Sequence, residues 1–248
     1  MAERTLRVCA LYPDLMNIYA DRGNLLLLER RCAWRGIGFR VVAAGLGDAI
    51  DPDAHDLFYI GGAQDRDQAL CAQDMVDTKR DALHAAAGAA KVVLAVCGGY
   101  QLLGHFYELG DERIPGVGLV DLHTIREDGP RLIGNVAIEV RLPGLDGAGG
   151  SRILAGFENH GGRTYLGDGE QPLGRVLKGH GNTGASGFEG VLRGHVVGTY
   201  LHGPLLPKNA WFADWLIATA LGTDDPLAPL DDALEDAAHA DARRVAGV

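Results

Sequence analysis

The sequence predicts an α/β fold in which a mostly parallel sheet is flanked by helices. Short apolar runs rich in β-branched residues alternate with helical segments through the N-terminal half, which is the pattern of βαβ units. Two of these runs end in glycine-containing segments, Gly61-Gly62 and Cys97-Gly98-Gly99. Because ligands of parallel sheets bind at the carboxyl ends of the strands, we expect both segments to contribute to one site.

The N-terminal half is expected to contain buried strands joined by helices. The strands are predicted at residues 6–12, 39–43, 56–60 and 92–96, where apolar residues run continuously. The helices are predicted at residues 17–35, 68–87 and 98–108. Pro13 ends the first strand and Gly36 ends the first helix.

After Pro115 the pattern changes to short strand-like runs between glycine-rich turns, which predicts additional antiparallel strands in the C-terminal half. These runs lie at residues 136–140, 175–177, 190–192 and 195–201, with a loop at 143–150 and a helix at 209–221. We divide the chain into one domain over residues 1–222 and an Ala- and Asp-rich segment over 223–248. That segment is either an acidic tail or an appended helix.

Length and charge restrict the function. The 248 residues suit one ample domain or one domain with an addition. The net charge of −10, from 33 acidic and 23 basic residues, argues against nucleic-acid partners and anionic membrane surfaces. No apolar run approaches the roughly 18 residues of a membrane span. No signal peptide precedes the first strand, so the expected location is the cytoplasm.

The cysteines give no sign of a metal site or a disulfide framework. Cys9, Cys32, Cys71 and Cys97 form no CxxC pair, so we expect no zinc ribbon. Disulfides are not expected at this chain length and cysteine density.

Cys97 has the sequence surroundings of a reactive nucleophile. An apolar run stops at Cys97, two glycines follow, and a helical pattern begins, which is the form of a nucleophile elbow. The positive end of the following helix favours the thiolate. The alternative is a small buried hydrophobic residue, the common state of a free cysteine.

A thiolate nucleophile needs a base and oxyanion donors. His202 ends the last clear strand, where the fold can bring it over Cys97; the alternative is a structural histidine that caps Pro204 or the final helix. The candidate oxyanion donors are the N–H of Gly98 and an N–H from the Gly61-Gly62 loop, for which we choose Gly62. Both could equally be ordinary turn glycines.

These motifs resemble a known enzyme class. Ala95-Val-Cys97-Gly-Gly99 with Gln101 resembles the elbow of class I, triad-type glutamine amidotransferases, whose usual pattern is G-x-C-x-G-x-Q. Ala95 replaces the first glycine of that pattern. Segments 61–65 and 198–203 resemble the oxyanion loop and the catalytic histidine of the cobyric acid synthase-like branch.

Two longer segments narrow the resemblance. Residues 11–24 (LYPDLMNIYADRGN) and 156–164 (GFENHGGRT) are similar to the glutaminase subunit of lipid II isoglutaminyl synthase, the GatD type. The similarity extends from about residue 6 to residue 221. It implies a flavodoxin-like, class I amidotransferase fold, and an enzyme that hydrolyses L-glutamine to glutamate and ammonia through a cysteine thioester.

The resemblance also implies roles for residues. Cys97 would attack the side-chain amide of glutamine, and His202 would protonate the leaving ammonia. Arg131 matches the family's arginine for the α-carboxylate of glutamine, although it could be a surface arginine in a loop. The remaining residues that would bind substrate are Gln64, Gln101, Asn159 and His160. A role of His160 as a second base is the less favoured alternative.

One departure from the broader class concerns the acid that orients the histidine. Triad-type glutaminases commonly carry a glutamate two residues beyond the histidine, but here that position is Pro204, and no acid follows until Asp214. Nothing else in the sequence stands out as an orienting group. Either Cys97 and His202 act as a dyad or a partner contributes an acid, and we predict the second.

Released ammonia needs an acceptor, and amidating a carboxylate needs ATP. The chain has no GK[ST] P-loop and no GxGxxG, so ATP and Mg are expected on another polypeptide and no cofactor in this chain. In the resembled family the partner is a Mur-ligase-like subunit, the MurT type. The heterodimer converts D-glutamate of the lipid II stem peptide to D-isoglutamine in peptidoglycan biosynthesis. Alternatives are a glutaminase component of another amidotransferase such as cobyric acid synthase, a Cys-His hydrolase, and an inert binding subunit.

Overall fold

A six-stranded sheet forms the centre of the molecule, seen in a computed structural model that describes residues 4–145, 150–223 and 227–248. Its strand order is β13-β14-β4-β3-β1-β2. The parallel strands are β1 (Thr5–Leu11), β2 (Gly38–Ala44), β3 (Leu57–Ile60), β4 (Val92–Val96) and β14 (Val196–Thr199), with β13 (Val191–Arg193) antiparallel at one edge. The order 2-1-3-4 followed by β14 is flavodoxin-like, which confirms the predicted fold class.

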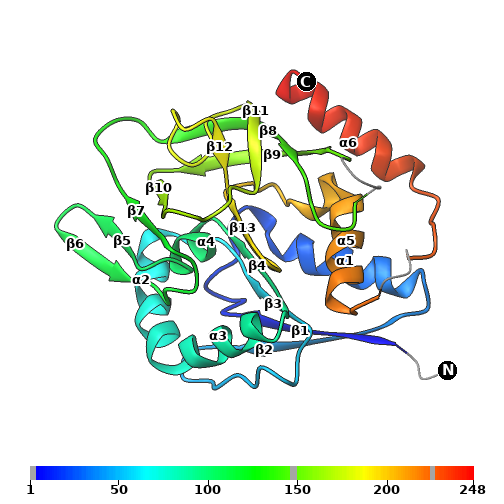
Figure 1. The fold of residues 1–248 in the computed structure, drawn as a ribbon, viewed down its shortest axis with the longest axis horizontal. Coiled ribbons are helices and arrows are strands. Elements are labelled where there is room, and N and C mark those ends of the chain that lie inside the picture. The colour runs from blue at the N-terminus through cyan, green and yellow to red at the C-terminus, as the bar shows by residue number, and fades with distance from the viewer. Residues whose placement is uncertain (1–3, 146–149, 224–226) are drawn as a thin grey trace.

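Helices cover both faces of this sheet. In Figure 1, α1 (Arg22–Ala33) and α5 (Ala210–Ala220) lie on one side, and α2 (Asp65–Asp74) and α3 (Arg80–Gly88) lie on the other. The β1-to-β2 and β3-to-β4 crossovers run in opposite directions along the sheet, so right-handed crossovers place their helices on opposite faces. Every residue of β3 and β4 is consequently buried, which explains their continuous apolar runs.

Two smaller four-stranded sheets follow in the second half of the chain. One contains β5 (Phe106–Leu109), β6 (Glu112–Pro115), β7 (Leu122–Ile125) and β10 (Arg163–Leu166). The other contains β8 (Leu132–Val140), β9 (Arg152–His160), β11 (Gly174–Lys178) and β12 (Phe188–Glu189). Nearly all of their pairings are antiparallel, as predicted for this half, and only β5 and β7 pair in parallel.

Two predicted helices differ from the structure. The helix expected at 98–108 ends early, because α4 covers only Gly98–Leu102 and Phe106–Leu109 is a strand. A Cβ at Gly104 would lie 2.5 Å from the Leu122 carbonyl oxygen, so the chain there passes directly against β7. The helix expected at 17–35 begins late, because Ile18–Ala20 is a 3₁₀ turn in which Tyr19 has a φ of 53°. Tertiary contacts of this turn override its helical pattern.

The helix expected at 68–87 is present as α2 and α3, joined by the π-helical turn Met75–Lys79. The extra residue of this turn lets Lys79 bury its side chain completely, with Nζ 2.5 Å from Asp74 Oδ2 and 4.7 Å from the Tyr12 ring centroid. Tyr12, which directly follows β1, also donates its hydroxyl to Asp74 at 2.6 Å, so this ion pair and the tyrosine together join the helices to the end of β1.

The C-terminal segment contains the helix α6 (Ala233–Ala246), which packs against β8 and β9 (Figure 1). The fully buried guanidinium of Arg31 binds Asp214 at 2.5 Å and Asp232 at 2.7 Å, so α1 is tied to the segment that leads into α6. Of the two alternatives for 223–248 the structure shows the helix, while the division at residue 222 stays a prediction. The expected loop at 143–150 and the start of the tail fall partly on residues 146–149 and 224–226, outside the described residues.

Candidate active site

Cys97 stands at the sharp turn between β4 and α4. Its backbone has φ 49° and ψ −106°, a conformation that costs a non-glycine residue on the order of 1–3 kcal/mol. Its N–H donates to the Thr199 carbonyl at 2.8 Å, which fixes the turn to β14. A Cβ at Gly99 would lie 2.8 Å from the Ile60 carbonyl oxygen, so this position requires glycine. The turn has the geometry of a nucleophile elbow, with a nearly buried thiol.

His202 lies beside this turn because its strand pairs with β4. Thr199 of β14 is opposite Val96 in the parallel ladder, so Cys97 and His202 leave the same end of neighbouring strands. The backbone of His202 forms an antiparallel bridge with Phe157 of β9, with N–O distances of 2.8 and 3.1 Å. The histidine is thus fixed between the central sheet and the β8–β9 sheet, and it is completely buried.

The imidazole of His202 contacts an acid on its Nδ1 side. Nδ1 lies 3.2 Å from Oδ1 of Asp21, and both side chains are fully buried. Burial lowers the pKa of His202, but interactions with Cys97 and then with Asp21 raise this pKa to about 10. Nε2 has no hydrogen-bond partner among the described residues. The imidazole is therefore charged near neutral pH, and Nε2 is available for proton exchange.

Asp21 corrects the prediction that no residue of this chain orients His202. We expected a partner to contribute the acid, because the position two residues beyond His202 is Pro204. The structure instead brings Asp21 from the turn after β1 to Nδ1 of His202. The only sequence signal for Asp21 was its place in the segment 11–24, which resembles the glutaminase subunits, and nothing local marked it as a partner of His202.

The predicted oxyanion donors are arranged differently from expectation. The N–H of Gly62 donates to Oδ2 of Asp21 at 2.8 Å and is not free to bind an oxyanion in this structure. Gly98 and the next loop amide, that of Ala63, have no acceptor recorded in the described chain, and a Cβ at Gly98 would lie 3.1 Å from the Ala63 nitrogen. Gly62 is still required as glycine, because a Cβ there would lie 2.7 Å from Cε1 of His202.

Gln101 and His160, both predicted to bind substrate, are buried in a polar network next to the elbow. Gln101 accepts a hydrogen bond from Gln68 at 2.9 Å and donates one to the Tyr200 hydroxyl at 3.1 Å. The ring of His160 stacks on Tyr200 with centroids 3.6 Å apart, and Nδ1 lies 2.8 Å from the Gly162 carbonyl oxygen. Burial lowers the pKa of His160, so its imidazole is neutral. No contact between His160 and Cys97 is recorded for the described residues.

Arg131 and Asn159 meet at the exposed rim above His202. Arg131 donates from Nε to the Asn159 side-chain oxygen and from a terminal nitrogen to the Asn159 carbonyl, both at 2.8 Å. Asn159 donates to the Tyr19 hydroxyl at 2.5 Å, and the Tyr19 ring lies 5.0 Å from the His202 ring. These contacts link Arg131, which is predicted to bind the α-carboxylate, to His202 through Asn159 and Tyr19. Gln64 is exposed at the start of α2.

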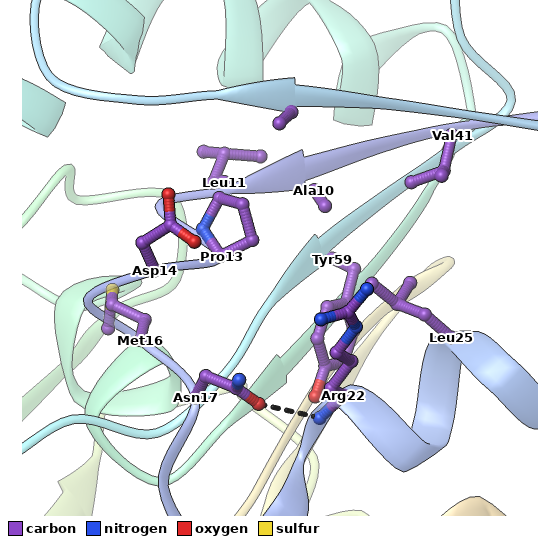
Figure 2. A pocket seen from close by; sticks show the side chains of 11 residues that line it. Ala10, Leu11, Pro13, Asp14, Met16, Asn17, Arg22, Leu25, Val41 and Tyr59 are labelled. Atoms are coloured by element: carbon purple, nitrogen blue, oxygen red, sulfur yellow. Dashed lines mark hydrogen bonds between the residues drawn. The ribbon is translucent and has the colours of Figure 1, made fainter.

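A separate pocket of about 360 Å³ lies between β1, β2 and α1 (Figure 2). None of the predicted site residues lines it. Asn17 on its wall accepts a hydrogen bond from the Arg22 N–H at 2.8 Å, the dashed line in Figure 2, and so caps the helix that follows Asp21. In the described part of the chain, no three His, Cys, Asp or Glu side chains are grouped to hold a metal. No helix there has the length and apolarity to cross a bilayer.

Known proteins are similar to this chain in sequence and in fold. A family model of the CobB/CobQ-like glutamine amidotransferase domain matches residues 7–210. The chain is 38% identical over 234 residues to the lipid II isoglutaminyl synthase (glutamine-hydrolyzing) subunit GatD of Streptococcus pneumoniae, which covers 92% of this chain and 87% of that protein. It is also 38% identical over 208 residues to the subunit of the same name from Staphylococcus aureus, with coverages of 84% and 81%.

A solved structure agrees with the fold. PurLQS from Thermotoga maritima superposes with a TM-score of 0.59 at 20% identity, over 88% of this chain and 96% of that chain. The likeness at this identity concerns the fold alone. The family model and the two relatives each span most of the chain, and the elbow, the histidine and the oxyanion loop lie within the matched residues. The chain therefore belongs to the CobB/CobQ-like glutamine amidotransferase family and is an enzyme of that class.

Proposed function

We propose that this chain is a glutaminase subunit that hydrolyses L-glutamine and delivers the ammonia to a synthetase. The observation that carries the proposal is the elbow at Cys97 beside a buried, charged His202. An imidazolium next to a sulfur favours the thiolate, the form in which cysteine acts as a nucleophile. Arg131 suits the α-carboxylate of an amino acid, because a guanidinium has five N–H donors and keeps further ones while two bind Asn159.

The reaction proceeds in two steps. The Cys97 sulfur attacks the side-chain amide carbon of glutamine, and the oxygen becomes an oxyanion that backbone N–H groups stabilise. The C–N bond then breaks, and the nitrogen leaves as ammonia with a proton from Nε2 of His202. In the second step, water loses a proton to His202 and attacks the thioester, which releases glutamate and restores the thiolate.

The acceptor of the ammonia is proposed from the relatives. Both are named as subunits of lipid II isoglutaminyl synthase, so we place this chain in a heterodimer with a Mur-ligase-like synthetase of the MurT type. The synthetase would activate the carboxylate of D-glutamate in the lipid II stem peptide with ATP and Mg, and ammonia would convert it to D-isoglutamine. The glutaminase would need no cofactor of its own. Glutamine and ATP are cytoplasmic substrates, so we place the reaction in the cytoplasm.

The test is a reconstitution with the candidate synthetase. Ammonia and glutamate are measured from wild-type protein and from Cys97→Ala, each alone and with the synthetase, and the lipid II product is analysed by mass spectrometry. We expect both products from wild type, amidated lipid II only with the synthetase and ATP, and none of these from Cys97→Ala. EDTA should leave glutamine hydrolysis unchanged. Persistent glutamine hydrolysis in Cys97→Ala would overturn the nucleophile, and hydrolysis without lipid II amidation would overturn the acceptor.

A further inference from the structure

We propose that Asp21 is the positioning residue of this site, with one carboxylate oxygen fixing the His202 imidazole and the other fixing the loop Gly61–Ala63. The inference rests on the proposed glutaminase function and deepens it. Asp21 is fully buried, and each of its oxygens has a different partner. Oδ1 faces Nδ1 of His202 at 3.2 Å, and Oδ2 accepts the N–H of Gly62 at 2.8 Å.

The contact between Oδ1 of Asp21 and Nδ1 of His202 selects the tautomer of the histidine. An ionised carboxylate can only accept hydrogen bonds, so Nδ1 of His202 must carry the proton that faces Oδ1. The neutral imidazole then has its lone pair on Nε2, which is the nitrogen left without a partner. Nε2 can therefore take a proton and return it to the leaving nitrogen. The nearby negative charge also stabilises the imidazolium that forms during each turnover.

The second contact sets the direction of the oxyanion loop. The Gly62 N–H is bound by Asp21, and the Gly62 carbonyl accepts a hydrogen bond from the Ile18 N–H at 3.2 Å. Because a trans peptide is planar, the Ala63 N–H points opposite to the Gly62 carbonyl, away from the Ile18 turn. That direction leads toward Gly98, whose built Cβ lies 3.1 Å from the Ala63 nitrogen. The oxyanion donors are thus the amides of Ala63 and Gly98, with Gly62 serving as the anchor.

The turn that carries Asp21 is itself held in place. The Tyr59 hydroxyl of β3 donates to the Asp21 carbonyl at 3.0 Å and accepts from the Asn24 side chain at 2.9 Å. The oxygen of that same Asn24 side chain accepts the N–H of Leu206, just beyond His202, at 2.8 Å. Asp21 follows β1 and Gly62 follows β3, on the two sides of the point where the strand order reverses. Contacts with β3 and with the segment after His202 therefore hold the turn that carries the Asp21 carboxylate.

No other carboxyl group occupies this position in the described chain. Glu189 also interacts electrostatically with His202, but its hydrogen bonds come from the Thr199 hydroxyl and the Tyr200 N–H, and none is recorded with His202. Burial raises the pKa of Glu189 to about 8, so it carries little charge at neutral pH. A carboxylate from a partner would have to displace Asp21, because the His202 side chain is fully buried.

The test compares Asp21→Asn with wild type in the full-length chain, with and without the synthetase. Asparagine keeps the volume and can still accept from Gly62, but its NH₂ group would face Nδ1 and impose the wrong tautomer. We expect kcat for ammonia release to fall about 10²- to 10⁴-fold while KM for glutamine changes less than about threefold. The pH profile of Cys97 alkylation by iodoacetamide should differ between the two proteins, with a lower rate at pH 7 in Asp21→Asn, because the imidazolium beside the sulfur is less stable there.

Two further variants separate positioning from folding. Glu189→Gln alters a buried carboxyl group that does not touch His202, and it should keep the kcat and the alkylation profile of wild type. Asp21→Ala should recover at least about tenfold in rate with added formate, which can occupy the vacated carboxylate site, whereas Cys97→Ala should recover nothing.

The outcomes distinguish a failure of the Asp21 proposal from a failure of the proposed glutaminase function. Wild-type kcat and the wild-type alkylation profile in Asp21→Asn would show that another group orients His202, and the proposal would be wrong. An equal loss of kcat in Glu189→Gln would indicate general damage to the buried site and would also contradict the proposal. If the wild-type protein released no ammonia from glutamine, the proposed function would fail. The alkylation profiles, which need no glutamine, would still decide the role of Asp21.

Discussion

Nδ1 of His202 lies 3.2 Å from Oδ1 of Asp21, although 181 positions separate the two residues in the chain. The residue two positions beyond the histidine, Pro204, packs on the same turn. A Cβ at Gly23 would lie 2.7 Å from Cγ of Pro204, so the proline ring rests directly on the first turn of α1. Pro204 therefore contacts the helix turn that directly follows Asp21.

The charge of His202 predicts how Cys97 reacts at different pH. The pKa of His202 is raised to about 10, so the imidazole carries a positive charge below that pH and loses it above that pH. In His202→Gln the thiolate has no neighbouring cation. We expect the rate of alkylation by iodoacetamide at pH 6 to fall at least about tenfold and to increase steadily with pH. A variant with the wild-type rate at pH 6 would mean that His202 does not support the thiolate.

Gly62→Ala should damage catalysis through steric contact. The added methyl group would lie 2.7 Å from Cε1 of His202 and 3.2 Å from Oδ2 of Asp21, in a site with no space to relax. We expect kcat for glutamine hydrolysis to fall about 10²-fold, because small displacements of catalytic groups have large effects. Gly88→Ala is the matched control, since a Cβ there meets no atom within 4 Å. Equal activity of the two variants would contradict the geometry described for His202.

Arg131→Ala tests the entrance to the site. The loss of a charged hydrogen bond to the α-carboxylate should raise KM for glutamine about 10- to 100-fold, with a smaller effect on kcat. Arg175→Ala serves as control, because Arg175 is an exposed arginine paired with Glu139 on the surface of the β8–β9 sheet. If KM is unchanged in Arg131→Ala, the carboxylate is bound elsewhere.

Asp74→Asn should reduce stability and change its dependence on pH. The variant leaves the fully buried Lys79 ammonium with a neutral partner, which costs about 3 kcal/mol in free energy of unfolding. Burial raises the pKa of Asp74, but hydrogen bonds from Lys79, Tyr12 and Gly47 lower it to about 2.

Because that pKa lies below the unfolded value of about 3.9, the contribution of Asp74 is complete above roughly pH 5 and is lost as the pH falls toward 2. Urea denaturation at several pH values measures it. The acid destabilisation of wild type should be smaller in Asp74→Asn and unchanged in Asp128→Asn, an exposed loop position. An identical acid slope in all three proteins would exclude this assignment.

Local sequence pattern was enough to predict that Cys97 and His202 lie at the same end of neighbouring strands. Cys97 and His202 each end a continuous apolar run, and parallel strands bring such ends to one edge of the sheet. The same pattern predicted every strand of the central sheet to within a few residues. The continuous apolar runs of β3 and β4 follow from burial on both faces of the sheet.

The features of the site and fold that the sequence did not predict depend on contacts between segments far apart in the chain. Asp21 lies in a stretch with a helical pattern, and only its contacts with Gly62 and His202 give it a role. The direction of the Ala63 amide depends on a hydrogen bond between Ile18 and Gly62 that no local pattern encodes. The strand at Phe106–Leu109 continues a helical pattern and becomes a strand because β6 and β7 offer it hydrogen bonds.

The backbone at Cys97 has a thermodynamic consequence for the evolution of this chain. Its φ of 49° and ψ of −106° suit glycine better than any residue with a Cβ. Cys97→Gly should therefore unfold at a higher temperature than Cys97→Ala, although neither can form a thioester. Selection for folding alone would replace the cysteine with glycine. A cysteine at this turn therefore costs the fold stability, and the proposed role of Cys97 as nucleophile accounts for that cost.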